Sequence, residues 1–241
     1  MSITSIFDET KQAMQGKWGL AIGAFVVFLL ITFGMQMVPF IGSLASIILS
    51  GPLSVGLCVF YLALVRNDEL KLELLFEGFN KFKESLLTYL AIFAIAIVFL
   101  AIMGTVLFIT GASSVFSLFS NLDSAQPDAI LNLMTSGAFS GSLLVTFILA
   151  TIFQLHVSQA YYLVAEENLS GFQALKESSR IMNGYKLKLF GLFLIMGIAG
   201  TILTIITFGL GLLLVAPFSL SALAIFYDKI NPKNEFAEVI A

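Results

Sequence analysis

Charged residues are scarce in this sequence, and four long stretches contain none. The 241 residues include 12 Lys and Arg and 15 Asp and Glu, whereas about a quarter of the residues in a soluble domain are charged. This balance excludes an ordinary soluble domain and a disordered chain, and the few basic residues exclude a nucleic-acid-binding protein. The uncharged runs are 18–65, 85–122, 129–165 and 189–227.

Residues that bind metals or take part in nucleophilic catalysis are almost missing as well. The single cysteine, Cys58, has no partner for an internal disulfide, and the single histidine, His156, cannot complete a Cys/His metal site with it. His156 also lacks a carboxylate nearby in the sequence for a catalytic triad, and no phosphate- or dinucleotide-binding glycine motif occurs. We therefore expect a protein that is not an enzyme and has no catalytic residues, metal or cofactor.

Each uncharged run is longer than the roughly 20 apolar residues that cross a bilayer as a helix. The runs 18–65 and 189–227 are long enough to cross twice, and each has a turn signal, at 39–43 and at 208–211. The apolar stretch from Trp18 is too long for the core of a signal peptide and lacks a small-residue cleavage site, so we expect a retained helix. The predicted fold is an all-α membrane protein, a single domain over residues 1–241, with six transmembrane helices at 18–38, 44–65, 86–110, 141–164, 187–207 and 209–227.

The basic residues fall on one side of this predicted topology. All of them precede an odd-numbered span or follow the last one, and the other connections contain none. Residues 111–140, between the third and fourth spans, are predicted to form a long loop and carry only Asp123 and Asp128. Because basic loops stay in the cytoplasm, we expect a multi-pass protein of the plasma membrane (in a bacterium, the inner membrane) with both termini cytoplasmic.

A short amphipathic segment precedes each odd-numbered span. Apolar residues recur at helical spacing in 3–14, 72–86 and 172–182, with charged residues on the other side. Such helices usually lie in the membrane interface, with the apolar face in the acyl boundary. The predicted fold therefore includes three cytoplasmic-side interfacial helices. Anionic lipid is expected to contact their basic residues, above all Lys81, Lys83, Lys176 and Arg180.

Two kinds of sequence match predict an internal repeat. GFNKFKES (78–85) and GFQALKES (171–178) are closely similar, and each even-numbered span ends in an aromatic pair, at 60–61, 161–162 and 226–227. The alternative is coincidence, because membrane proteins use few residue types and place aromatic residues at interfaces. The predicted units, each an amphipathic segment followed by two spans, are 1–66, 70–165 and 169–230.

The fourth predicted span is the most polar, with Gln154, His156 and Gln159 close together. These side chains are candidates for binding a headgroup or a small solute, and the commoner alternative is hydrogen bonding between helices, at roughly 0.6 kcal/mol per contact. Pro52 and Pro217 lie inside the second and sixth spans, where each removes a backbone donor. They are candidates for helix kinks, which serve packing or, as in some transporters, expose carbonyl groups to ions.

Three segments carry a recognisable pattern: KQAMQGKWGLAIG (11–23), GPLSVGL (51–57), and 174–230 with its Gly-x-Gly turn and terminal Phe-Tyr pair. They resemble a bacterial integral-membrane protein family of unknown function. The resemblance covers most of the chain except 111–140. That family is distantly similar to the membrane domain that precedes some glycerophosphodiester phosphodiesterases. No catalytic residues are associated with this membrane domain, so the resemblance implies a membrane fold and no reaction.

These features lead to three hypotheses on function. The first is a lipid-interacting or membrane-organising protein whose partners are membrane lipids, with a protein partner or a homo-oligomer left open and no nucleic acid. The second is a transporter or channel for a small or apolar solute, which would use the polar part of the fourth span and the two prolines. The third, by analogy alone, is a membrane partner of an enzyme.

Overall fold

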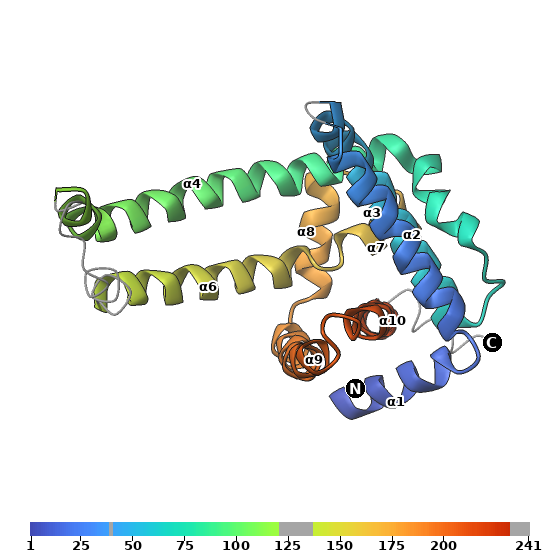
Figure 1. Ribbon diagram of the computed structural model, residues 1–241. Coiled ribbons are helices and arrows are strands. Elements are labelled where there is room, and N and C mark those ends of the chain that lie inside the picture. The colour runs from blue at the N-terminus through green and yellow to red at the C-terminus, as the bar shows by residue number, and fades with distance from the viewer. Residues whose placement is uncertain (39–40, 121–136, 232–241) are drawn as a thin grey trace. The chain divides into compact units, whose positions relative to one another are not determined.

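The computed structural model describes residues 1–38, 41–120 and 137–231, and every regular element within these ranges is a helix (Figure 1). The described residues contain six helical stretches that are long and apolar enough to cross a membrane. This confirms the predicted all-α class and the number of spans. The elements are α1 (Ile3–Met14), α2 (Trp18–Gln36), α3 (Ile41–Arg66), η1 (Leu72–Lys81), α4 (Phe82–Ser120), α6 (Gly137–Val157), α7 (Ala160–Glu167), α8 (Phe172–Ile181), α9 (Lys186–Ile206) and α10 (Leu212–Ile230).

The chain forms two compact units. The core unit comprises Met1–Ile92 and Leu155–Ala241, and the hairpin unit comprises Phe93–Gln154. The first and third predicted repeat units lie wholly within the core unit, whereas the second is divided between the two. The compact units therefore do not follow the boundaries of the predicted repeat.

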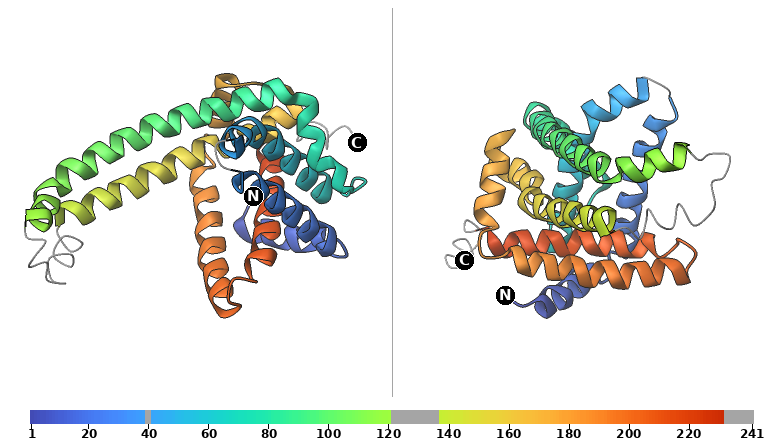
Figure 2. Two further views of the ribbon diagram at one scale, coloured as in Figure 1. Left: turned by 45° about the horizontal axis from the view of Figure 1, so that its top comes forward. Right: turned by 90° about the vertical axis from the view of Figure 1, so that its left-hand side faces the viewer.

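In the hairpin unit, α4 and α6 run side by side as a long pair of helices (Figures 1 and 2). Phe99 stacks on Phe153 with ring centroids 6.3 Å apart, and the hydroxyl of Thr146 donates a hydrogen bond to the sulfur of Met103. Many apolar side chains point outward: Phe147, for example, is 67% exposed. Helices that are apolar all round are typical of a membrane span.

The helix α4 is longer than the sequence predicts. The third span is expected to end near residue 110, but the helix continues to Ser120. Gly111 directly follows the predicted end and is a helix-ending signal, but no proline or charged residue follows in 112–120, and the helix continues through the glycine. The prediction that 111–140 is a loop is therefore wrong for 111–120. Residues 121–136 lie outside the described residues, and α6 begins at Gly137.

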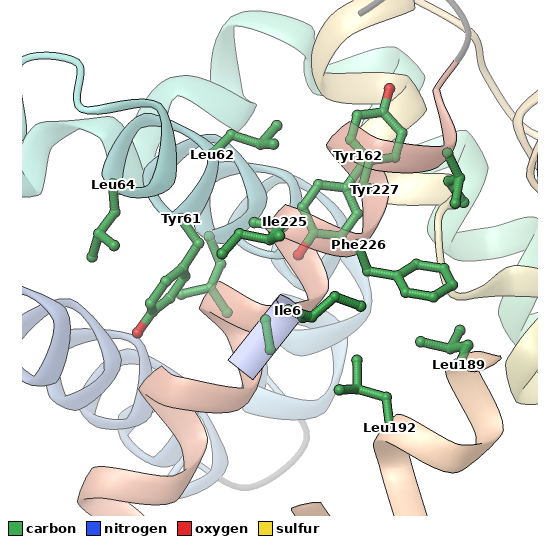
Figure 3. Packing of buried hydrophobic residues seen from close by; sticks show 14 of the residues in the cluster. Ile6, Tyr61, Leu62, Leu64, Tyr162, Leu189, Leu192, Ile225, Phe226 and Tyr227 are labelled. Atoms are coloured by element: carbon green, nitrogen blue, oxygen red, sulfur yellow. The ribbon is translucent and has the colours of Figure 1, made fainter. Parts of the chain in front are cut away.

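Large side chains from five helices fill the interior of the core unit (Figure 3). All twelve of the largest fully buried side chains belong to this unit. Figure 3 labels members of this interior from α1 (Ile6), α3 (Tyr61, Leu62, Leu64), α7 (Tyr162), α9 (Leu189, Leu192) and α10 (Ile225, Phe226, Tyr227).

The three amphipathic segments bury part of their apolar faces in the protein, while Phe76, Phe82 and Phe172 remain exposed. On α1, Ile6, Thr10 and Met14 are completely buried at four-residue spacing. On α8 the buried residues are Ala174, Leu175, Ser178 and Ile181, and on η1 they are Leu75 and Gly78. Their amphipathic pattern therefore reflects packing against other helices of the core unit. The expectation that these apolar residues meet acyl chains does not hold for them, and the position of the segments in the membrane interface stays a prediction.

The segment η1 packs against α3 backbone to backbone. It is a 3₁₀-helix of ten residues, long for an element that rarely exceeds three or four. A Cβ atom at Gly78 would overlap the carbonyl oxygen of Pro52, and one at Gly56 would overlap that of Leu75. Only glycine permits such an approach, so this pair of glycines fixes η1 against the second span.

Candidate functional site

The ends of three spans meet in the core unit. The helices α3 and α10 carry an aromatic pair near their C-termini, and α7 carries one in its first turn. Tyr162 stacks on Tyr227 with ring centroids 5.0 Å apart (Figure 3). The hydroxyl of Tyr61 donates a hydrogen bond to the carbonyl of Ala21 at 2.9 Å. Tyr61, Tyr162 and Tyr227 are 0–3% exposed, so they pack inside the protein and do not form an outward-facing aromatic belt.

A triad of charged side chains lies where these helices end. The Arg66 guanidinium contacts Glu166 at 2.5 Å and binds both carboxylate oxygens of Asp228, at 2.5 and 3.2 Å. The side chains of the triad are 23–32% exposed. Asn231 adds a hydrogen bond from its amide nitrogen to the Tyr227 hydroxyl at 2.9 Å. The Arg66 guanidinium thus joins acidic residues from two other spans. Its two contacts with Asp228 are bidentate, a geometry that arginine provides and lysine does not.

The electrostatics of the triad favour a permanently charged Arg66. Burial lowers the pKa of the guanidinium, but hydrogen bonds and charge from Asp228 and Glu166 outweigh this, so the pKa lies above its ordinary value. A group whose pKa is raised by folding contributes stability at every pH below its unfolded pKa. The unfolded pKa of arginine lies above any pH at which the protein would be studied. Raising the pH within that range therefore does not deprotonate Arg66 or open the triad. We therefore assign it a structural role, that of holding α3, α7 and α10 together.

Two lysines cap the ends of spans two and four in the same manner. Lys17 donates hydrogen bonds to the carbonyl of Leu64 at 3.0 Å and to the side chain of Asn67 at 2.8 Å. Lys81 donates to the carbonyls of Val164 at 3.3 Å and Ala165 at 2.5 Å. A cation at a helix C-terminus satisfies carbonyl groups that have no partner within the helix.

The polar part of the fourth span coincides with a break between α6 and α7. Ser178 of α8 enters this break: its hydroxyl donates to the carbonyl of His156 at 2.6 Å and accepts from the backbone N–H of Gln159 at 3.2 Å. The side chain of Lys186 lies 2.7 Å from Nε2 of His156. Gln159 is completely buried, and its side-chain amide donates to the Ser158 hydroxyl at 3.2 Å. The polar residues therefore connect helices of the core unit; Gln154 belongs to the hairpin unit, where its side chain is exposed.

The four basic residues predicted to contact lipid differ in their surroundings. Lys81 is half-buried and caps α7, and Arg180 forms an ion pair with Glu177, which raises the pKa of the Arg180 guanidinium. Lys83 and Lys176 are exposed, and within the described part of the chain neither makes a hydrogen bond or an ion pair. The structure thus separates Lys81 and Arg180, which have partners within the protein, from Lys83 and Lys176, whose ammonium groups are exposed.

Both prolines lie inside helices, as predicted. The carbonyl of Pro52 is covered by Gly78 of η1, and the carbonyl of Pro217 accepts a hydrogen bond from the Ser221 hydroxyl at 2.9 Å. Both prolines are buried, which favours a role in packing. The carbonyl groups that they leave without an intrahelical donor are those four residues earlier, at Ile48 and Leu213.

The sequence interpretation missed the charged triad and the insertion of Ser178 into the helix break. One signal for the triad was present: Arg66, Glu166 and Asp228 each stand within a few residues of an aromatic pair. If the three pairs meet, the charges beside them meet too. No comparable sequence signal pointed to Ser178.

The model of the family described as "Protein of unknown function (DUF975)" matches residues 1–234, and the chain belongs to this family. The comparison with curated proteins and the comparison with solved structures each found no match. The family match covers nearly the whole chain, and it assigns neither a reaction nor a ligand.

Proposed function

We propose that this member of the DUF975 family is a non-enzymatic protein of the plasma membrane that binds anionic lipid at its cytoplasmic face. The observation that carries the proposal is the exposed side of α8. Phe172, Lys176 and Arg180 follow one another at four-residue spacing and are all exposed, while the opposite side of the helix is buried. Phe172 is 69% exposed, which suits an aromatic residue at headgroup level beside the ammonium group of Lys176, which attracts phosphate; Arg180 is paired with Glu177.

The distribution of charge supports a cytoplasmic position for this surface. Every basic residue precedes an odd-numbered span or follows the last one, which under the positive-inside rule places both termini in the cytoplasm. The cytoplasmic leaflet carries the anionic lipids, and each nearby basic residue gains about 1 kcal/mol from them. In a bacterium, the membrane would be the inner membrane.

The alternative, a transporter or channel for a small or apolar solute, has less support. Its candidate polar site is the break between α6 and α7, and there Ser178 satisfies the backbone groups of His156 and Gln159. One observation still favours it: the side-chain oxygen Oε1 of Gln159 is buried and has no hydrogen-bond partner in the described part of the chain. A buried unpaired acceptor costs about 1–3 kcal/mol, which a bound solute or water would recover.

The full chain reconstituted in bilayers of phosphatidylcholine with a minor share of phosphatidylglycerol tests the proposal. Spin-labelled versions of the two lipids report how strongly each is immobilised at the protein surface. We expect the anionic lipid to be immobilised in preference, with the preference declining as salt screens the charges. Equal immobilisation of both lipids at low salt would contradict the proposed function.

A further inference from the structure

The basic residues of the core unit divide into those with protein partners and those without. Contacts within the protein engage eight of them through hydrogen bonds, ion pairs or, for Lys188, the ring of Tyr185. These eight are Lys17, Arg66, Lys71, Lys81, Arg180, Lys186, Lys188 and Lys229. Among the described residues, three lysines remain without such a contact, and all three are exposed: Lys11, Lys83 and Lys176.

These three lysines occupy the same place in the three predicted repeat units. Lys83 and Lys176 stand at the same position of GFNKFKES and GFQALKES. In all three units a phenylalanine stands four residues before the lysine, in the pairs Phe7–Lys11, Phe79–Lys83 and Phe172–Lys176. None of these phenylalanines is fully buried, and each pair belongs to the segment that leads into an odd-numbered span. The pattern recurs although the segments differ in structure: the first and third pairs lie in the α-helices α1 and α8, whereas Phe79 lies in the 3₁₀-helix η1 and Lys83 in the first turn of α4.

Neighbouring ion pairs leave the charge of two of these lysines uncompensated. Glu177 stands next to Lys176 and is bound by Arg180. Glu9 stands two residues before Lys11 and is bound by Lys229 at 2.7 Å. In each case another basic residue already binds a nearby carboxylate, so that carboxylate is not left to pair with the exposed lysine. An exposed ammonium group beside an aromatic ring at the entrance of a membrane span suits the phosphate of an anionic phospholipid.

We propose that Lys11, Lys83 and Lys176 form three equivalent headgroup sites, each of which binds the phosphate of one anionic phospholipid. This inference rests on the proposed function and sharpens it, because it assigns lipid binding to one lysine per repeat unit. Lys81 and Arg180, which the sequence alone places in the same group, act within the protein. At the third site the exposed ring of Phe172 sets the depth, among the upper acyl carbons and glycerol groups, whereas Phe7 stacks on Phe218 within the protein.

The test compares variants of the full chain in the same spin-label measurement. Each lysine contributes about a fivefold preference for the anionic lipid at its own site, since about 1 kcal/mol per basic residue corresponds to this factor. The double variant Lys83→Gln with Lys176→Gln should leave one of the three sites, so the number of preferentially immobilised anionic lipids should fall from three to one. The matched control, Lys71→Gln with Lys188→Gln, removes the same charge from exposed lysines that have protein partners and should leave all three sites.

Two further variants keep the proposal falsifiable if the double variant folds poorly. Replacing Lys11, Lys83 and Lys176 by arginine preserves the charge and should retain all three sites, whereas Lys176→Gln alone should reduce the preferentially immobilised lipids from three to two. The inference is overturned if the double variant keeps the wild-type preference, or if the control loses as much. Absence of any preference in the wild-type protein would instead contradict the proposed function, so the two failures are distinguishable.

Discussion

Phe60 in the core unit is completely buried, whereas Phe147 in the hairpin unit is 67% exposed, although both lie in uncharged apolar helices. The two helices thus use the same residue for different contacts, with protein in the first case and with lipid, as we infer, in the second. What distinguishes the units is their polar residues. The core unit has the charged triad, two lysine caps and the Ser178 bridge, while residues 93–154 contain no basic residue at all.

This difference shows where specificity resides in an apolar membrane protein. Lipid tails and leucine side chains are equally apolar, so burial of apolar surface alone does not direct one helix to another within a bilayer. Close backbone approach, hydrogen bonds and ion pairs do so, and they concentrate in the core unit. Four substitutions, each paired with one elsewhere in the chain, can break or sharpen the comparison.

The largest effect is expected at the glycine that holds η1 against α3. Gly78→Ala places a Cβ atom against the Pro52 carbonyl and should lower the free energy of unfolding by about 3 kcal/mol or more. Gly104→Ala in the hairpin unit meets no atom within 4 Å and should be neutral or stabilise by up to about 1 kcal/mol. Reversible unfolding in mixed detergent micelles measures both, and equal losses would refute the comparison.

The charged triad should give the next largest effect. Arg66→Gln leaves Glu166 and Asp228 without their shared cation, and we expect a loss of about 2 kcal/mol for these partly exposed groups. Lys71→Gln removes an ion pair with Glu69 whose side chains are 58% and 79% exposed, and should cost less than about 0.5 kcal/mol. Thermal unfolding of the two variants side by side provides the measurement. A loss at Arg66 no larger than at Lys71 would show that the triad does not hold the helix ends.

A smaller effect is expected at the break between α6 and α7. Ser178→Ala removes the hydroxyl that bonds to His156 and Gln159, with an expected loss of about 1–2 kcal/mol. The paired variant is Thr105→Val in the hairpin unit, because Thr105 bonds only to Ala101 within its own helix; its effect should be close to zero. Hydrogen exchange at the amide of Gln159 should quicken in the first variant alone, and unchanged exchange would contradict the bridging role.

The smallest effect is expected on the outer surface of the hairpin unit. Phe147→Leu exchanges one exposed apolar side chain for another and should change the free energy of unfolding by less than about 0.5 kcal/mol. The same exchange at the completely buried Phe226 should cost about 1 kcal/mol, because it leaves a cavity in the core unit. If Phe147 proves the more sensitive residue, the hairpin surface contacts protein and not lipid.

The spans and the class of fold were predictable because they depend on local composition. A run of apolar residues without charge fixes a spanning helix almost independently of its neighbours, and the turn predicted at 208–211 lies between the end of α9 at Ile206 and the start of α10 at Leu212. The sixth span ends at Ile230, three residues beyond its predicted end. Its last turn includes Asp228 and Lys229, whose charges lie in ion pairs with Arg66 and Glu9.

The surroundings of the basic residues were not predictable in this way. Lys81 and Lys83 are two residues apart in one segment, yet one caps α7 and the other is exposed. Which of them meets lipid depends on where α7 ends in space, and no local pattern contains that information. The same holds for the amphipathic segments, because a helical pattern of apolar residues is the same whether the partner is lipid or protein.

The number of anionic lipids held by the protein tests the account most directly. Native mass spectrometry of the full chain, released from nanodiscs that contain phosphatidylglycerol and phosphatidylcholine, counts the lipids that remain bound. We predict retention of phosphatidylglycerol in preference, up to one molecule for each of Lys11, Lys83 and Lys176, with one fewer after Lys176→Gln. Equal retention of both lipids, or an unchanged number in that variant, would contradict the assignment of these lysines to lipid headgroups.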